Sequence, residues 1–167
     1  HGLAQNRLDN INYKAGIFTS FSHDHLDYHK SMKAYFNAKL ILFKKLLKKD
    51  QHVITHKELN NFSVLKKVIL KRRLKLLTIK SNKKFESYYP KHIFGKFQRD
   101  NLAMSIIAAK VCGLKDKNIK KVLNKIKQVE GRLELVKKFP NNIKVYVDYA
   151  HTPDALSSTI QTLKKLK

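Results

Sequence analysis

The alternation of short apolar, β-branched segments with amphipathic segments is the feature that most constrains how this chain can fold. The sequence predicts strands at 13–21, 52–55 and 74–80, and helices at 32–48, about 58–71, about 99–112 and 117–127. Strands that alternate with helices pair in parallel, because each crossover returns the chain to the same edge of the sheet. We therefore expect an α/β fold with a mostly parallel sheet flanked by helices. Further short strands are predicted at 85–89 and 92–97.

Residues with capping chemistry mark the ends of these helices. Ser31 and Asp116 are expected N-caps, and Gly113 suits the position after a helix end. A linker at 129–131 is followed by strands at 132–138 and 143–148, joined by a Pro-Asn-Asn turn. Thr152 and Pro153 then open a helix that runs to Lys167. We expect one domain at 1–129 and the start of another, a β-β-α unit, at 130–167.

Charge and composition limit the classes of partner. The formal net charge is +24, but only 5 of the 36 basic residues are arginine, and the lysines are spread over several helices. We interpret them as the product of an AT-rich coding sequence and as solvated helix faces, not as a nucleic-acid site. The lone Cys112 excludes disulfides, and no apolar run is long enough to span a bilayer. We expect a cytoplasmic, monomeric fragment with no nucleic-acid or membrane partner.

Lys39 departs from the pattern of the helix at 32–48. Its apolar side chains, among them Phe36 and Phe43, fall within an arc of about 100° on a helical projection, and Lys39 lies inside that arc. In one interpretation the lysine stem packs on the core while the ammonium reaches water. In the other the lysine is functional, because a desolvated neutral amine can capture CO2 and become an anionic oxygen ligand suited to Mg²⁺.

Two further segments carry groups that could do chemistry. SHDHLDYH (22–29) follows a predicted strand, where open α/β sheets place ligands, and offers His25, Asp24 and Asp27 to a metal. A hydrogen-bonded polar loop is the alternative. VDYAHTPDAL (147–156) sets Asp148 and His151 at a strand–helix turn, ready for a ribose or phosphate. The alternative there is a structural turn in which Asp148 bonds to the backbone.

The order of the motifs resembles a known family. HGLAQNRLD (1–9), FTSFSHDHLDYH (18–29), YFNAKLILF (35–43), GKFQRDNLAMSIIAA (95–109), EGRLELV (130–136) and VDYAHTPDAL (147–156) are similar to motifs of the Mur ligases. Within that family they resemble the ligases that add the third amino acid of the peptidoglycan stem peptide. The resemblance implies the central, ATP-hydrolysing domain of a Mur ligase at 1–129, truncated at its N-terminus, and at 130–167 the first β-β-α unit of its Rossmann-like C-terminal domain.

By position, the resemblance implies a Mg²⁺ site and a substrate site. His25 and a carbamylated Lys39 would be metal ligands and catalytic residues, together with a glutamate expected just before His1. The motif that begins at His1 grips the UDP-sugar in the family, so His1, Gln5 and Arg7 are expected to bind the substrate.

The resemblance also implies a nucleotide site. Asn101 would lie near the adenine, Arg132 and Asp148 would contact the nucleotide, and His151 would lie beside it. Gln98 stands where the family usually has asparagine, which puts one nucleotide contact in doubt.

The implied reaction is ATP-dependent amide formation. ATP would phosphorylate the terminal carboxylate of UDP-MurNAc-dipeptide, and an amino acid would displace phosphate from the acyl phosphate. The chain has no G-x-x-x-x-G-K-[ST] loop, so we expect the triphosphate cradle to lie outside it and the isolated chain to be inactive. The alternatives are another Mur or folylpolyglutamate-type ligase, or a basic nucleic-acid-binding protein.

Overall fold

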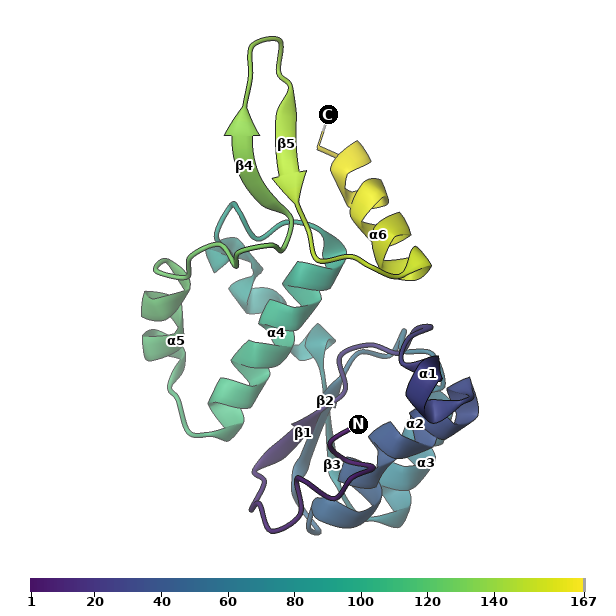
Figure 1. Cartoon of the computed structure of the whole chain (residues 1–167). Coiled ribbons are helices and arrows are strands. Elements are labelled where there is room, and N and C mark those ends of the chain that lie inside the picture. Colours follow the sequence, from purple (N-terminus) through teal and green to yellow (C-terminus); the bar gives the residue numbers. More distant parts are fainter. Residues whose placement is uncertain (167) are drawn as a thin grey trace.

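A three-stranded parallel sheet organises the first part of the molecule (Figure 1). The structure is a computed structural model that describes residues 1–166, without the side chains of 81–84. The strands are β1 (Ala15–Ile17), β2 (His52–Thr55) and β3 (Lys75–Thr78), in the spatial order β1-β2-β3. The predicted parallel α/β arrangement is confirmed.

The first strand is shorter than the predicted 13–21, and its end has a physical cause. The side chain of Thr55 donates its hydroxyl to the carbonyl of Phe18 (2.8 Å), and the His56 ring lies 3.0 Å from the carbonyl of Thr19. Because side chains occupy these carbonyls, backbone pairing with β2 stops and the chain turns away as a loop.

Helices cover both faces of the sheet. α2 (Met32–Ile41), the π-helical turn η1 (Leu42–Leu46) and α3 (Phe62–Lys71) lie on one face, and α4 (Lys96–Val111) lies on the other. Consecutive residues of β2 point to opposite sides: Val53 packs in the cluster with Phe43 and Leu65, whereas Ile54 packs against Met104. Both strand residues are fully buried, as expected for the middle strand of a parallel sheet.

The strands predicted at 85–89 and 92–97 are wrong. A 3₁₀ helix, η2 (Ile79–Tyr88), covers the first range, and no strand is assigned over the second, which lies wholly within the described part of the chain. Aromatic residues made the region resemble strands, but Phe85 is instead fully buried against Ile106 and Ile119. Tertiary packing against helices has overridden local propensity here.

Helix ends agree with capping chemistry in most places. The Ser31 hydroxyl accepts a hydrogen bond from the backbone N–H of Ala34 (3.1 Å), and Gly113 follows α4 with φ of 92°. Asp116 was expected to cap α5 (Asp116–Leu123), but Lys115 occupies the cap and Asp116 lies in the first turn. There its carboxylate still suits the positive end of the helix.

A hairpin and a helix complete the chain. β4 (Glu134–Lys138) and β5 (Lys144–Val147) pair antiparallel, with an irregularity between Leu135 and Lys137, and α6 (Pro153–Lys164) follows. The hydroxyl of Thr152 accepts a hydrogen bond from the N–H of Ala155, so the predicted N-cap is confirmed. The end of the predicted helix, at Lys167, lies outside the described residues. In Figure 1 the hairpin projects away from the parallel sheet and α6 lies beside it.

Candidate functional site

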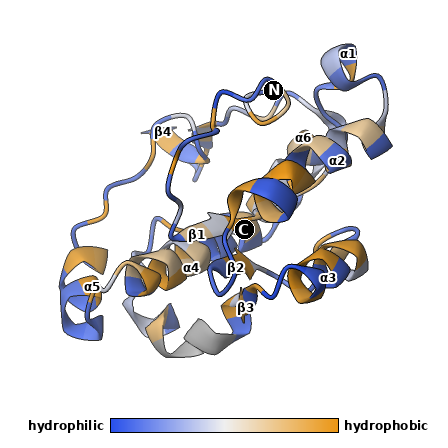
Figure 2. Ribbon diagram, turned by 90° about the horizontal axis from the view of Figure 1, so that it is seen from below, coloured by the Kyte–Doolittle hydropathy of each residue, from blue (hydrophilic) through white to orange (hydrophobic). Residues whose placement is uncertain are grey.

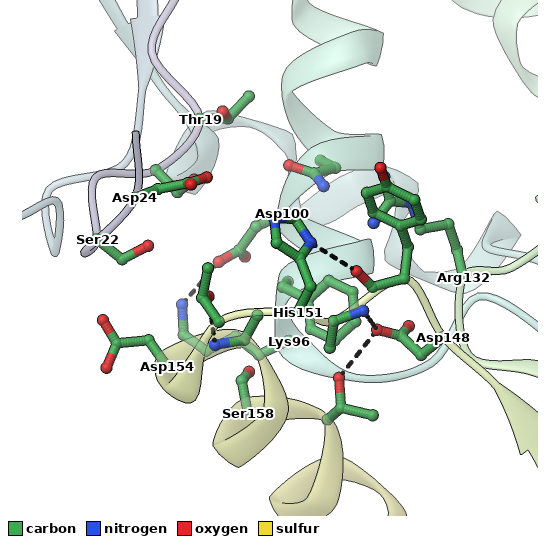
Figure 3. A pocket seen from close by; sticks show the side chains of 18 of the residues that line it. Thr19, Ser22, Asp24, Lys96, Asp100, Arg132, Asp148, His151, Asp154 and Ser158 are labelled. Atoms are coloured by element: carbon green, nitrogen blue, oxygen red, sulfur yellow. Dashed lines mark hydrogen bonds and ion pairs between the residues drawn. The ribbon is translucent and has the colours of Figure 1, made fainter. Parts of the chain in front are cut away.

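A cleft of about 810 Å³ opens where the parallel strands end. Figure 3 shows its walls, which come from the loop after β1, the first half of α4, and the turn from β5 into α6. The polar side chains that line the cleft include Ser22, Asp24, Asp100, Asn101, Asp148 and His151, together with Arg132 from the linker before β4. A crevice outside the carboxyl ends of parallel strands is the usual ligand site of open α/β sheets.

Asp148 fixes the turn that forms the third wall. One carboxylate oxygen accepts a hydrogen bond from the N–H of Leu133 (2.8 Å), and the other accepts from the N–H of Ala150 (2.8 Å) and the hydroxyl of Thr159 (3.2 Å). These bonds tie the turn to the start of the hairpin and to α6. The structural-turn interpretation of Asp148 is therefore confirmed, while the carboxylate also lines the cleft.

Arg132 supplies a cation to the cleft. Its guanidinium carbon lies 4.8 Å from the centre of the exposed Tyr149 ring, and its carbonyl accepts a hydrogen bond from the Gln98 side-chain amide (2.8 Å). Gln98, where a nucleotide contact was in doubt, thus binds the linker between α5 and β4 instead. This contact and the cation–π contact position the guanidinium at the edge of the cleft.

Asn101 and His151 complete the set expected to meet a nucleotide. Asn101 lies on α4 and lines the cleft, while its backbone carbonyl accepts a bond from Ser105. The His151 ring nitrogen Nδ1 lies 3.0 Å from the carbonyl of Tyr149, which orients the exposed ring. The structure therefore brings Asn101, Arg132, Asp148 and His151 to one cleft.

The sequence did not predict an ion-pair cluster at the same cleft. The Lys96 ammonium lies 2.7 Å from the carboxylate of Asp100 and 3.0 Å from that of Glu58. The hydrogen bond to Asp100, opposed by partial burial, raises the pKa of Lys96, and the bond from Lys96 lowers the pKa of Glu58. The i,i+4 spacing of Lys96 and Asp100 was a visible signal, whereas Glu58 is distant in sequence.

His25 and Lys39 lie against one aromatic ring, Tyr35. The His25 ring centre is 5.6 Å from that of Tyr35, with the planes at 85°. The Lys39 ammonium lies 4.8 Å from the same ring centre and 5.7 Å from that of Phe18. Lys39 is half-buried, and in the described part of the chain no carboxylate lies within ion-pair distance of it. The structure thus places the two predicted metal ligands around the same side chain.

Asp24 contacts both the backbone and the ring of His25, whose Nε2 lies 3.5 Å from the Asp24 carboxylate. His25 has a left-handed conformation with φ of 54°, and its N–H donates to the carboxylate of Asp24 (2.8 Å), which lines the cleft. Within the described residues, no three His, Cys, Asp or Glu side chains gather closely enough to hold a metal by themselves. The expectation that His25 and a carbamate on Lys39 hold a metal therefore stays a prediction, and such a site would need further ligands.

The substrate candidates lie apart from the cleft. The ring of His1, predicted to bind the substrate, lies 5.1 Å from the ring of His25 and 5.5 Å from that of His29. Gln5 and Arg7 are exposed and do not line the cleft. The backbone N–H of Gln5 donates to the carbonyl of His1 (3.0 Å), so these two predicted substrate residues are neighbours outside the cleft.

Comparisons with known proteins agree with this architecture. A family model described as the Mur ligase middle domain matches residues 1–124, and one described as the Mur ligase glutamate ligase domain matches 131–167. A UDP-N-acetylmuramoyl-L-alanyl-D-glutamate--2,6-diaminopimelate ligase from Rickettsia bellii is 32% identical over 188 residues, covering 100% of this chain and 39% of its own length. A protein of the same name from Zymomonas mobilis is 34% identical over 186 residues, covering 98% and 38%.

Solved structures show the same fold at low identity. MurF from Acinetobacter baumannii has a TM-score of 0.70 at 12% identity, with 92% of this chain and 38% of that one covered. An FPGS mutant from L. casei has a TM-score of 0.69 at 20% identity, with 95% and 44% covered. The chain spans about two fifths of the length of the curated relatives it matches. From the family match over most of its length, the chain belongs to the Mur ligase family.

Proposed function

We propose that this chain is part of an ATP-dependent ligase that adds the third amino acid to UDP-MurNAc-dipeptide. The relatives named above attach 2,6-diaminopimelate to UDP-N-acetylmuramoyl-L-alanyl-D-glutamate, according to their names, and this supports the same acceptor and amino acid here. The observation that carries the proposal is the cleft, because it gathers Asn101, Arg132, Asp148 and His151 from separate segments of the chain. These are the four residues expected to meet a nucleotide.

The proposed reaction has two steps. A substrate carboxylate oxygen attacks the γ-phosphorus of ATP, which releases ADP and leaves an acyl phosphate. The amine of the incoming amino acid then attacks the acyl carbon, releasing phosphate and a proton and forming the amide. Catalysis of phosphoryl transfer depends mainly on positioning and on stabilising charge. Arg132, held by Tyr149 and Gln98, offers a positioned cation for this purpose.

His25 and Lys39 are the residues that would hold Mg²⁺. Lys39 is half-buried, and no carboxylate among the described residues lies within ion-pair distance of its amine. Addition of the amine to CO2, with release of protons, would leave a carbamate. Tyr35 contacts both side chains and orients them. When bound, the metal would neutralise negative charge on the phosphoryl group being transferred.

A binding experiment tests the nucleotide site directly. The 167-residue chain is titrated into a fluorescent ATP analogue and followed by anisotropy. Arg132→Ala should weaken binding by about ten- to a hundredfold, the range for a lost contact to a charged group. Arg99→Ala is the matched control, because Arg99 is an exposed arginine on α4 outside the cleft lining. Equal affinity of the two variants for the analogue would contradict the proposed site.

A second experiment tests the acceptor. Thermal unfolding of the chain with the ATP analogue is followed with either UDP-MurNAc-dipeptide or a folate added. We expect UDP-MurNAc-dipeptide, and not the folate, to raise the Tm, since a ligand that binds only the folded state stabilises that state. Stabilisation by the folate alone would instead favour a folylpolyglutamate-type ligase, the class to which the similar fold of FPGS points.

A further inference from the structure

Two lysine-rich segments that are separate in sequence meet at one end of the molecule. Residues 44–50 and 66–75, called here the basic end, carry ten exposed basic side chains and one acidic residue, Asp50. The ten are Lys44, Lys45, Lys48, Lys49, Lys66, Lys67, Lys71, Arg72, Arg73 and Lys75. In the part of the chain that the structure describes, none of them pairs with a carboxylate.

Direct hydrogen bonds hold the two segments together. The Arg72 guanidinium donates to the carbonyl of Leu47 (3.1 Å), and the N–H of Asp50 donates to the carbonyl of Arg73 (3.0 Å). The N–H of Lys75 donates to the carbonyl of Gln51 (2.9 Å). These bonds therefore bring together the ends of the two lysine-rich segments.

The basic end lies away from the cleft. It is formed where η1 and α3 end and where β2 and β3 begin, which is the amino edge of the parallel sheet. The cleft lies at the opposite, carboxyl edge. Figure 2 looks at the molecule from below, and hydrophilic ribbon marks the connections into β2 and β3. A partner at the basic end would leave the cleft open.

An apolar side chain projects among these cations. Leu70 is 68% exposed, the highest value for a large hydrophobic residue in the described part of the chain. Lys66 and Lys67 precede it by one helical turn on α3, and Lys71 follows it. A single exposed leucine needs no explanation by itself. A leucine surrounded by lysines, however, complements a surface whose outer layer is anionic and whose next layer is apolar, because the lysines can contact the first and the leucine can enter the second.

We propose that the basic end binds the surface of membranes that contain anionic phospholipids, with Leu70 entering the headgroup layer. The contact is peripheral, since no helix in residues 1–166 is long and apolar enough to cross a bilayer. Nucleic acid fits less well, because the basic end has no aromatic side chain for base stacking and only two arginines. This proposal revises the expectation of no membrane partner and does not depend on the proposed ligase function.

Vesicle co-sedimentation of the full chain tests the proposal. Vesicles that contain phosphatidylglycerol should bind the chain, pure phosphatidylcholine vesicles should not, and high salt should weaken binding. The variant Lys66→Gln, Lys67→Gln, Lys71→Gln should lose about 100-fold in partition coefficient, because each lysine near an anionic surface contributes about fivefold. Leu70→Ser should also weaken binding, at unchanged net charge.

Matched variants separate a defined surface from general attraction. Lys117→Gln, Lys121→Gln, Lys125→Gln changes net charge equally at α5 and just beyond it, where Val122 is also exposed. The fold loss in partition coefficient of this α5 control should be less than a tenth of the fold loss of the α3 variant. Lys48→Gln, Lys49→Gln, from the other segment of the basic end, should weaken binding about 25-fold.

Four results would overturn the proposal. They are no binding to anionic vesicles, equal losses in the α5 control and the α3 variant, no effect of Leu70→Ser, and binding of duplex DNA or RNA in place of vesicles. The last would assign the basic end to nucleic acid.

Discussion

Replacing Asp148 by alanine should destabilise the hairpin and α6 even without any nucleotide. The carboxylate accepts three hydrogen bonds, and the substitution leaves the N–H groups of Leu133 and Ala150 without it. Leu133 is fully buried and has φ of 49°, a left-handed conformation that costs a non-glycine residue about 1–2 kcal/mol. The bond from its N–H to Asp148 helps to hold that conformation.

The magnitude follows from these contacts. A hydrogen bond to a charged group contributes about 1.5–3 kcal/mol, and Asp148 is half-buried, which favours the lower end for each bond. Two backbone bonds and a weaker one to Thr159 therefore give a loss of about 3–4 kcal/mol for Asp148→Ala. Asp148→Asn keeps one accepting oxygen and should lose about half as much.

Urea unfolding and hydrogen exchange together measure this effect. The free energy of unfolding should fall as stated, and the amides of Leu133 and Ala150 should exchange faster. A loss below about 0.5 kcal/mol, within the range of ordinary surface substitutions, would refute the structural role. If Asp148→Ala lowered the affinity for the nucleotide but left the free energy of unfolding unchanged, the role of Asp148 would be ligand binding only.

Three further substitutions test the packing and the titrating groups. Gly16→Ala places a methyl group 2.9 Å from the Phe43 ring, so thermal unfolding should show a loss of about 1–3 kcal/mol, and an unchanged Tm would contradict the packing. Thr55→Val removes the buried bond to the carbonyl of Phe18 and should cost about 1–3 kcal/mol in urea, whereas a gain in stability would contradict it. Burial lowers the pKa of His29 below 6.5, so the unfolded chain binds this proton more readily, and stability should fall as pH drops from 6.5 towards the folded-state pKa. His29→Phe should flatten that acid-side loss in unfolding curves, and an unchanged pH profile would show that His29 is not its source.

Local signals predicted the elements whose ends are set by local chemistry. Ser31 and Thr152 accept the hydrogen bonds expected of N-caps, and β2 occupies the predicted residues. The prediction of strands after β3 was wrong because the structure of this stretch depends on residues distant in sequence. Phe85 is buried by Ile106 and neighbouring helical side chains, which no local pattern reveals.

The candidate site, too, was predictable only in part, because its contacts join residues that are far apart in sequence. Motif resemblance identified the residues that line the cleft, because it carries information on residues far apart in sequence. It could not show that Asp148 is occupied by backbone donors, or that Gln98 reaches the carbonyl of Arg132. The meeting of Lys96 with Glu58 also needs the folded chain, since it joins the loop after β2 to α4.

We propose that Lys39 carries a carbamate and shares a metal ion with His25, and the ligase mechanism depends on this arrangement. Carbon NMR of the chain in ¹³C-labelled bicarbonate tests it most directly, with Mn²⁺ added afterwards as a paramagnetic probe. We predict one carbamate resonance that is absent from Lys39→Arg and that Mn²⁺ broadens less in His25→Ala. Absence of the resonance in the parent chain, or its persistence in Lys39→Arg, would contradict the claim.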